Sequence, residues 1–172
     1  MICPDCHHDN IVGADVCEGC GASLTHREEI TNALERGIIA HSVDVLCAKR
    51  PICVSAATSV HEAMDLMMKH QTGAVLVETD GELAGIFTER DVLNDVSQDV
   101  SQMSEGLEHH MTASPVTITK NDSIAYAMHA MDVGGYRHLP VVDSAGMPTG
   151  IVSARDIMRF LCVRYANSRD DE

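Results

Sequence analysis

The sequence predicts a mixed α+β or α/β fold in which one β-α-β-β-α unit occurs twice behind a short cysteine-rich segment. The nine residues Gly85–Leu93 (GIFTERDVL) recur 65 residues later as Gly150–Met158 (GIVSARDIM). Around both copies, strand-like alternation and helix-like spacing of apolar residues follow one another in the same order. Four of the seven cysteines precede residue 21. Self-similarity at one fixed offset identifies a structural unit that the chain uses twice.

Charge and composition exclude several classes of function. The chain has 172 residues, which suffices for one ordinary domain or two small ones with a real core. Twelve Lys and Arg against 26 Asp and Glu give a net charge of −14, so the average surface repels phosphate backbones and anionic lipid. No apolar run approaches the roughly 18 residues of a membrane span, and the N-terminus lacks the pattern of a signal peptide. We therefore expect a cytoplasmic protein without a membrane partner or a general affinity for nucleic acid.

The N-terminal cysteines have the spacing of a metal site. Cys3 and Cys6 form one C-x-x-C pair, and Cys17 and Cys20 form a second. Two such turns on a short hairpin place four thiolates at the corners of a tetrahedron, as Zn²⁺ requires at about 2.3 Å per sulfur. Because protein ligands fill all four corners, the zinc is expected to be structural. The alternatives are a pair of disulfides, a rubredoxin-like iron site and a thioredoxin-like redox motif, none of which suits a short cytosolic segment without a βαβ pattern.

The cysteine-rich segment, residues 1–24, resembles the short zinc ribbons at the ends of many prokaryotic proteins. A segment of this size has no core of its own, so metal binding of roughly 10–16 kcal/mol would be its folding free energy. His7 and His8 are expected to be exposed hairpin residues and not ligands. Residues 25–41 are expected to form a linker helix, because an S/T-x-x-E capping pattern begins at Thr25.

The first copy of the repeat is expected to span residues 42–100. A short strand is predicted at Ile52 and Val54, and Ser59 and Glu62 have capping-box spacing at the start of a helix with one apolar face. The Asp80-Gly81 pair predicts a hairpin turn. The remaining elements of this copy are strands at Ala74–Val77 and Leu83–Phe87 and a helix that begins at Thr88.

The second copy is expected to span residues 108–165. Its expected elements are a helix with Ile124, Ala127, Met128 and Met131 on one face, strands at Leu139–Val142 and Gly150–Val152, and a helix that begins at Ser153. The polar stretch Ser97–His110 is interpreted as a solvated linker between the copies, and residues 166–172 as a frayed acidic tail. Cys47, Cys53 and Cys162 are expected to be inert buried thiols.

The repeat resembles a tandem pair of cystathionine β-synthase (CBS) domains, together called a Bateman module, over roughly residues 42–165. The motifs that carry this resemblance are GIFTERD (Gly85–Asp91), GIVSARD (Gly150–Asp156) and RHLPVVD (Arg137–Asp143). The resemblance implies clefts between two CBS domains that bind AMP, ADP, ATP or a related adenosyl ligand. It also implies that two modules pair through their helices into a homodimer.

The repeated motif has a chemistry of its own. A hydroxyl at the end of a strand, followed three residues later by Asp in the first turn of a helix, places a carboxylate beside the free amides of the helix start. Such a carboxylate can accept hydrogen bonds from two ribose hydroxyls, but the same spacing also fits a helix cap. The resemblance favours the binding interpretation. It implies ligand contacts at Thr88, Arg90 and Asp91, at Arg137 and His138, and at Ser153, Arg155 and Asp156, with Val54 and Ile118 as apolar or backbone neighbours of the base.

The sequence favours a regulatory function over catalysis. It has no evident nucleophile with a base, no metal site with an open position and no phosphate-transfer loop. We expect a sensor of an adenine nucleotide that signals to an unidentified protein partner through the zinc ribbon. One alternative is a nucleic-acid-associated regulator with the CBS pair as its switch, although residues 1–24 contain no Lys or Arg. The other alternative is a structural adaptor whose clefts hold no ligand.

Overall fold

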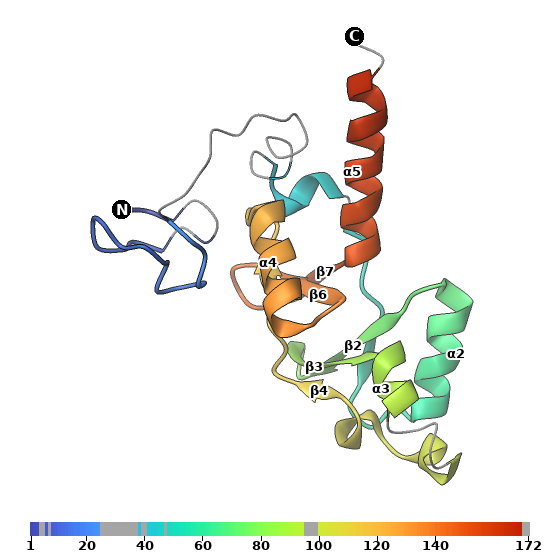
Figure 1. Cartoon of the computed structure of the whole chain (residues 1–172). Helices are drawn as coiled ribbons and strands as arrows, with labels where there is room; N and C mark the ends of the chain where they lie inside the picture. Colours follow the sequence, from blue (N-terminus) through green and yellow to red (C-terminus); the bar gives the residue numbers. More distant parts are fainter. Residues whose placement is uncertain are drawn as a thin grey trace. The chain divides into compact units, whose positions relative to one another are not determined.

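The computed structural model describes residues 1–3, 6, 8–24, 38, 41–46, 48–94 and 100–169, without the side chains of residues 165 and 167–169 (Figure 1). The expected linker helix, apart from Ile38 and His41, therefore lies outside the described residues, as do Cys47 and the end of the tail after residue 169. The first repeat consists of β1 (Cys53–Ser55), α2 (Val60–His70), β2 (Ala74–Thr79), β3 (Glu82–Thr88) and α3 (Glu89–Asn94). The second consists of β5 (Ile118–Thr119), α4 (Ile124–Gly134), β6 (His138–Val142), β7 (Pro148–Ser153) and α5 (Ala154–Arg169). The β-α-β-β-α order predicted for both copies is confirmed.

Local sequence explains where the first repeat begins and turns. Ser59 accepts from the Glu62 backbone N–H at 3.2 Å, while the Glu62 carboxylate accepts from the Ser59 N–H at 3.2 Å, so the predicted capping box is formed. Between β2 and β3, Asp80 and Gly81 both have positive φ, at 54° and 85°. Two such residues make the turn whose twist matches an antiparallel hairpin.

The first repeat forms a four-stranded sheet in the order β1-β2-β3-β4, where β4 is Thr112–Ala113. β1 runs parallel to β2, and β2 and β3 are antiparallel with a register shift at Val77/Glu78. Gly85 of β3 pairs with Ala113 of β4. A Cβ on Gly85 would lie 2.4 Å from the Met111 Sδ and 3.1 Å from the Thr112 carbonyl oxygen, so a larger residue here would displace the Met111 side chain.

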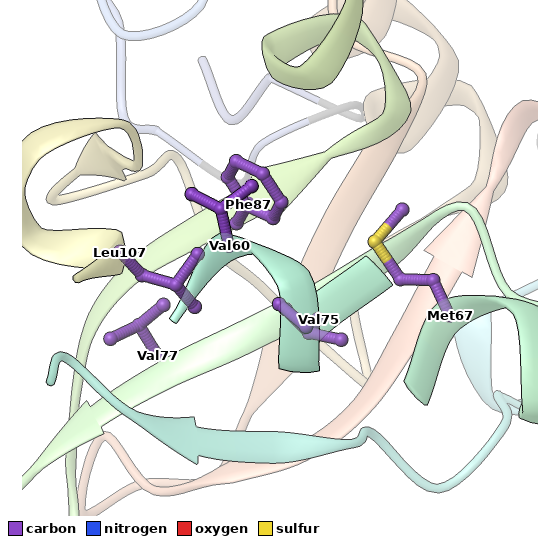
Figure 2. Packing of buried hydrophobic residues seen from close by; sticks show 7 residues of the cluster. Val60, Met67, Val75, Val77, Phe87 and Leu107 are labelled. Atoms are coloured by element: carbon purple, nitrogen blue, oxygen red, sulfur yellow. The ribbon is translucent and has the colours of Figure 1, made fainter. Parts of the chain in front are cut away.

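The sheet of the first repeat separates two groups of buried side chains. On one face, Val75, Val77 and Phe87 pack against Val60, Ala63 and Met67 of α2, as Figure 2 shows for most of them. The other face presents Ala74, Leu76 and Ile86 to Ile151 of β7. Successive side chains of a strand point to opposite faces, which explains why the near-continuous apolar run of β2 serves both groups.

The segment that joins the two repeats is not wholly solvated as predicted, because Met103 and Leu107 pack in the first core, whereas Glu105, Glu108 and His109 are exposed. Residues 100–110 contain two 3-10 helices, η3 (Val100–Ser104) and η4 (Leu107–His109), and Leu107 is fully buried against Val60 and Phe87 (Figure 2). The Leu107 N–H donates to the Thr58 carbonyl at 2.9 Å. The interpretation of His110 as solvated is also wrong, because its side chain is 7% exposed and bonds to Glu105. A single apolar residue in a polar stretch gives no periodic signal, so the sequence pattern does not predict that Leu107 is buried.

The second repeat contributes a three-stranded sheet in the order β5-β6-β7. Ser123 caps α4 by accepting from the Tyr126 N–H at 3.0 Å, and Gly135 ends the helix at φ 65°. Another 3-10 helix, η1 (Val43–Leu46), contacts α5, and the Val43 N–H donates to the Asp122 carbonyl. α5 continues to Arg169, four residues into the segment interpreted as a frayed tail.

Two compact units divide the chain, and they do not coincide with the two repeats. Unit 1 comprises residues 1–48, 118–139 and 152–172, and unit 2 comprises residues 49–117 and 140–151. The hairpin end of the second repeat belongs to unit 2 because Ile151 packs against the sheet of the first repeat. The domain limits read from the sequence follow the repeat, and they stay a prediction.

Candidate functional site

The four N-terminal cysteines converge on one point. Cys3 and Cys6 come from one hairpin with an antiparallel bridge between Ile2 and Asp9, and Cys17 and Cys20 from a second hairpin. The four Sγ atoms lie within 4.8 Å of one another, with Cys3–Cys20 at 3.8 Å and Cys6–Cys17 at 3.5 Å. A tetrahedral zinc with bonds of about 2.3 Å requires sulfur–sulfur separations of about 3.8 Å. The donor set therefore fits a Cys₄ zinc site, and no other metal-ligand cluster occurs among the residues described above.

Backbone amides and one side chain surround the sulfurs. The N–H groups of His8, Gly19 and Ala22 donate to the sulfur of the cysteine two positions earlier in each case. The Gly19 N–H donates to the Cys17 Sγ at 3.3 Å. Gly19 is also at a tight position, since a Cβ on Gly19 would lie 2.8 Å from the His8 Cβ. Such hydrogen bonds delocalise thiolate charge and orient the ligands.

Asn10 is a supporting residue that the sequence analysis missed. Its side chain is almost fully buried, and its Nδ2 donates to the Cys17 Sγ at 3.4 Å and to the His8 carbonyl at 3.0 Å. Its Oδ1 accepts from the Glu18 N–H at 2.8 Å. One amide thus joins both hairpins and a ligand sulfur. The signal available in the sequence was a lone Asn between two C-x-x-C pairs, which is not distinctive.

The thiols of the cluster differ in acidity. Burial raises the pKa of the Cys6 and Cys20 thiols. Burial also opposes ionisation of Cys17, but hydrogen bonds from Asn10 and from backbone N–H groups outweigh it and lower the pKa of Cys17 to about 6. Cys17 is therefore stabilised as the thiolate by protein hydrogen bonds, and a bound cation would stabilise the thiolates of Cys6 and Cys20.

The N-terminal ribbon lies against α4 within unit 1. The His129 Nε2 of α4 is hydrogen bonded to the Cys20 carbonyl. On the same helix, burial and the charges of Asp122, Cys6 and Cys20 raise the pKa of Tyr126. Tyr126 and His129, one turn apart on α4, thus both lie beside the cysteine cluster. The sequence carries no signal of this contact, because it joins residues far apart in the chain.

The repeated hydroxyl–Asp motif has the same geometry in both copies. In the first, the Asp91 Oδ2 accepts from the Thr88 N–H and from the Thr88 Oγ1, both at 2.7 Å. In the second, the Asp156 Oδ2 accepts from the Ser153 N–H at 2.9 Å and from its Oγ at 2.5 Å. These bonds close the start of α3 and of α5. The capping interpretation of these residues therefore accounts for one carboxylate oxygen in each copy.

A second chain segment reaches each helix start. The carbonyl of Arg137 accepts from the Ala154 N–H at 2.9 Å, which brings the loop before β6 to the first turn of α5. In the first repeat the Gly73 carbonyl accepts from the Glu89 N–H at 3.1 Å in the corresponding place. The Arg137 side chain is exposed, whereas the first copy has Thr72-Gly73 there. Arg137, Ser153 and Asp156 are thus brought together in one unit, with a cation that the first copy lacks.

The other predicted ligand residues occupy distinct environments. Arg90 and Arg155 are exposed on the first turns of α3 and α5. His138 is half-buried at the start of β6. Val54 packs at the edge of the first core, and Ile118 is buried in β5, so core packing accounts for both.

Two of the remaining cysteines differ from expectation, because Cys53 and Cys162 are exposed and not buried. Desolvation and the neighbouring Glu78 carboxylate nevertheless raise the pKa of Cys53 to about 12, which keeps the thiol protonated at neutral pH.

Family comparison agrees with the fold and with the repeated motif. The model of the CBS domain matches residues 43–98 and 105–163. Each match contains one strand–helix start with its hydroxyl–Asp pair. The chain therefore belongs to the CBS-domain family, as a tandem pair.

Individual relatives and solved structures are similar over the same region. A 17.7 kDa protein of Acidianus ambivalens is 30% identical over 124 residues, which are 72% of this chain and 74% of that protein. The structure of the CBS-domain containing protein ATU1752 of Agrobacterium tumefaciens matches this chain with a TM-score of 0.64 and 31% identity. The match covers 69% of this chain and 97% of that one. The CBS domain pair of protein MJ0100, in complex with 5′-methylthioadenosine and S-adenosyl-L-methionine, matches with a TM-score of 0.64 and 25% identity over 72% of this chain and 97% of that one.

Several relatives are longer proteins. The chain spans 52% of CBSX3 of Arabidopsis thaliana, at 36% identity over 107 residues and 59% of this chain. It spans 23% of a homoserine O-acetyltransferase of Methanocorpusculum labreanum, at 28% identity over 117 residues and 67% of this chain. Within the described part of the chain, every helix is too short or too polar to cross a bilayer.

Proposed function

We propose that this chain is a regulatory protein that binds an adenosine-containing ligand, in the class of AMP, ADP or ATP, at the starts of α3 and α5. The observation that carries the proposal is the identical hydroxyl–Asp geometry of Thr88/Asp91 and Ser153/Asp156 in a tandem CBS pair. The MJ0100 CBS pair, which has the same fold, is in complex with two adenosine compounds.

Ribose recognition would use the carboxylate oxygen that does not cap the helix. The capping bonds of Asp91 and Asp156 all use Oδ2, so Oδ1 is the atom we assign to the 2′- and 3′-hydroxyls. The helix cap then has a positioning function, since it fixes the carboxylate before the ligand arrives. Preorganised carboxylate acceptors of this kind select the diol of a ribose.

The two sites would differ in their preference for phosphate. Arg155 on α5 and Arg137 on the adjoining loop supply two cations near Ser153, together with His138. The first copy offers Arg90, with Val54 as an apolar neighbour. We therefore assign phosphate-bearing ligands to the second copy and expect weaker phosphate dependence at the first. Ile118 would be the corresponding apolar or backbone neighbour of the base in the second copy.

The zinc ribbon would serve as the output of the sensor. The Cys₄ cluster suits structural zinc in a reducing, cytoplasmic compartment, and the ribbon contacts α4, whose C-terminal loop leads to Arg137 and His138. A ligand that binds one arrangement of this loop more tightly would shift the position of α4 and of the ribbon. The chain itself would be non-enzymatic, would pair into a homodimer and would signal to a protein partner.

Calorimetry on zinc-loaded protein tests the proposal. AMP, ADP, ATP, NAD, S-adenosylmethionine and 5′-methylthioadenosine are titrated into the wild type and into Asp91→Asn and Asp156→Asn variants. Asparagine retains an oxygen that can cap the helix but loses the charge, so the fold is expected to survive while affinity at the altered site falls about 10- to 100-fold. Asp65→Asn is the matched control, because Asp65 is an exposed acid on α2 that pairs only with His61 among its described contacts.

Each outcome of the titrations distinguishes between hypotheses. Saturable binding that is lost at one site per variant supports the sensor and counts its sites. Absence of heat from every ligand, with folded and metal-loaded protein, would reduce Asp91 and Asp156 to helix caps and favour a structural adaptor. Retention on DNA that weakens with salt would favour the nucleic-acid-associated regulator, which the acidic ribbon argues against.

A further inference from the structure

Helix α4 connects the ribbon to the second hydroxyl–Asp motif. The helix ends at Gly134, and a short loop leads from there to Arg137, whose carbonyl accepts from the Ala154 N–H at 2.9 Å. The ribbon, α4, this loop and the start of α5 all belong to unit 1. A continuous set of contacts within one compact unit therefore joins the cysteine cluster to Ser153 and Asp156.

His129 of α4 contacts the ribbon through a hydrogen bond. Its Nε2 is bonded to the Cys20 backbone carbonyl, and because a carbonyl oxygen only accepts, this nitrogen carries the hydrogen. Cys20 is one of the four candidate zinc ligands, so the position of its carbonyl depends on the bound metal. Elsewhere on α4, Ile124, Ala127 and Met131 are buried in the protein. The ribbon thus holds, at His129, a helix whose other contacts are with the core.

The C-terminal end of α4 is packed against the loop that follows it. A Cβ on Gly134 would overlap the ring of Tyr136, so this ring lies directly against the last residue of the helix. The positive φ of Gly135, 65°, turns the chain at this point. A helix moves as a stiff element, so a displacement of α4 at His129 also displaces the loop that carries Arg137.

The first repeat has a different residue at the position that corresponds to His129. Asp65 and His129 stand at the same distance along the chain from the capping serines of α2 and α4. Asp65 is exposed and pairs with His61 of its own helix. The motif of the first repeat, with Asp91, belongs to unit 2, whereas the ribbon belongs to unit 1. We therefore expect the two adenosine sites to respond differently to the state of the ribbon.

We propose that His129 couples the metal state of the ribbon to the affinity of the second adenosine site, at Asp156. With metal bound, the Cys20 carbonyl is fixed, and His129 holds α4 in the arrangement that presents Arg137 to the ligand. Without metal, residues 1–24 lose their folding free energy, the hydrogen bond is lost, and the loop before β6 favours an arrangement of lower affinity. His129 is a positioning residue, since it acts through α4. This coupling rests on the adenosine site proposed above, and it makes the ribbon an input of the sensor as well as its output.

Calorimetry with AMP measures the coupling in the full chain. AMP is the probe because the triphosphate of ATP would itself bind zinc. The Asp91→Asn chain isolates the second site and the Asp156→Asn chain the first, and each is titrated zinc-loaded and after removal of zinc under a reductant. Loss of zinc should lower the AMP affinity about tenfold at the second site and less than about twofold at the first. By reciprocity, saturating AMP should raise the zinc affinity of the Asp91→Asn chain about tenfold.

Variants of His129 test whether its hydrogen bond carries the effect. In the zinc-loaded Asp91→Asn chain, His129→Leu removes the donor and should lower the AMP affinity about fivefold, and removal of zinc should then change it less than about twofold. His129→Gln keeps an N–H donor and should retain most of the coupling. His61→Leu is the matched control, because His61 is an exposed histidine of α2, and it should keep the tenfold ratio. Zinc content and helical circular dichroism check that each variant is folded.

The outcomes separate the coupling from the proposed function. If AMP does not bind the zinc-loaded wild type, the adenosine site fails for AMP and the coupling is overturned with it. Saturable AMP binding whose affinity at the second site does not depend on zinc overturns the coupling alone. The coupling is also overturned by an equal loss of affinity at both sites, which would indicate a general loss of stability, and by a tenfold ratio that persists in His129→Leu.

Discussion

Replacing Asn10 by alanine should weaken metal binding although Asn10 is not a ligand. In the wild type its side chain makes three hydrogen bonds, at 3.4 Å to the Cys17 Sγ, 3.0 Å to the His8 carbonyl and 2.8 Å from the Glu18 N–H. Alanine removes all three in a place that is only 4% exposed. The two backbone groups would then lack these partners beside the cluster.

The size of the effect follows from these contacts. The loss of residues that support a metal ligand typically lowers affinity 10- to 100-fold, or about 1.4–2.7 kcal/mol. The Glu18 N–H loses its partner, which costs about 1 kcal/mol and lies near the lower end of this range, whereas the His8 carbonyl keeps its bond from the Cys3 N–H at 2.8 Å. The Cys17 thiol should also lose its main stabilising partner, so its pKa should rise from about 6 and zinc affinity should fall most steeply as pH decreases toward 6.

The assay is competition for Zn²⁺ against a chromophoric chelator at several pH values. Asp9→Asn is the control, because the Asp9 carboxylate is 83% exposed and pairs with the N-terminal ammonium outside the cluster. An affinity for Asn10→Ala within twofold of the wild type at all pH values would refute the reasoning that Asn10 stabilises the site.

Further predictions concern the first repeat. Leu107→Ala should lower the free energy of unfolding by about 3 kcal/mol in urea titrations. Met68→Ala, at a 68% exposed position, should change it by less than about 0.5 kcal/mol. Equal effects of the two changes would contradict the burial of Leu107 in the first core. Gly85→Ala should lower the thermal midpoint, at a cost of about 1–3 kcal/mol, because its Cβ would meet the next strand; an unchanged midpoint would argue against this packing. Iodoacetamide should label Cys53 slowly at pH 8 because its pKa is raised to about 12, and Glu78→Gln should accelerate labelling only in part, since burial is the larger cause; full acceleration would assign the shift to Glu78 alone.

The candidate sites were predictable to the extent that their signals are local. The spacing of Cys3, Cys6, Cys17 and Cys20 sufficed to predict four converging sulfurs, because a C-x-x-C turn fixes its own geometry. The hydroxyl–Asp motifs were recognisable for the same reason, as both residues lie within one turn of a helix. Asn10 was not predictable, since its importance depends on which two hairpins it joins.

Local sequence patterns sufficed to predict the repeat, the order of strands and helices, the capping box at Ser59 and the hairpin turn at Asp80-Gly81. These features depend on side-chain periodicity and on backbone preference over a few residues, so they can be predicted from short stretches of sequence. Three features became visible only in the folded chain: Leu107 completes the first core, Ile151 packs on the first sheet, and the ribbon contacts α4. These groups are buried by contacts between segments that are far apart in the sequence. A pattern that spans a few residues cannot predict such contacts.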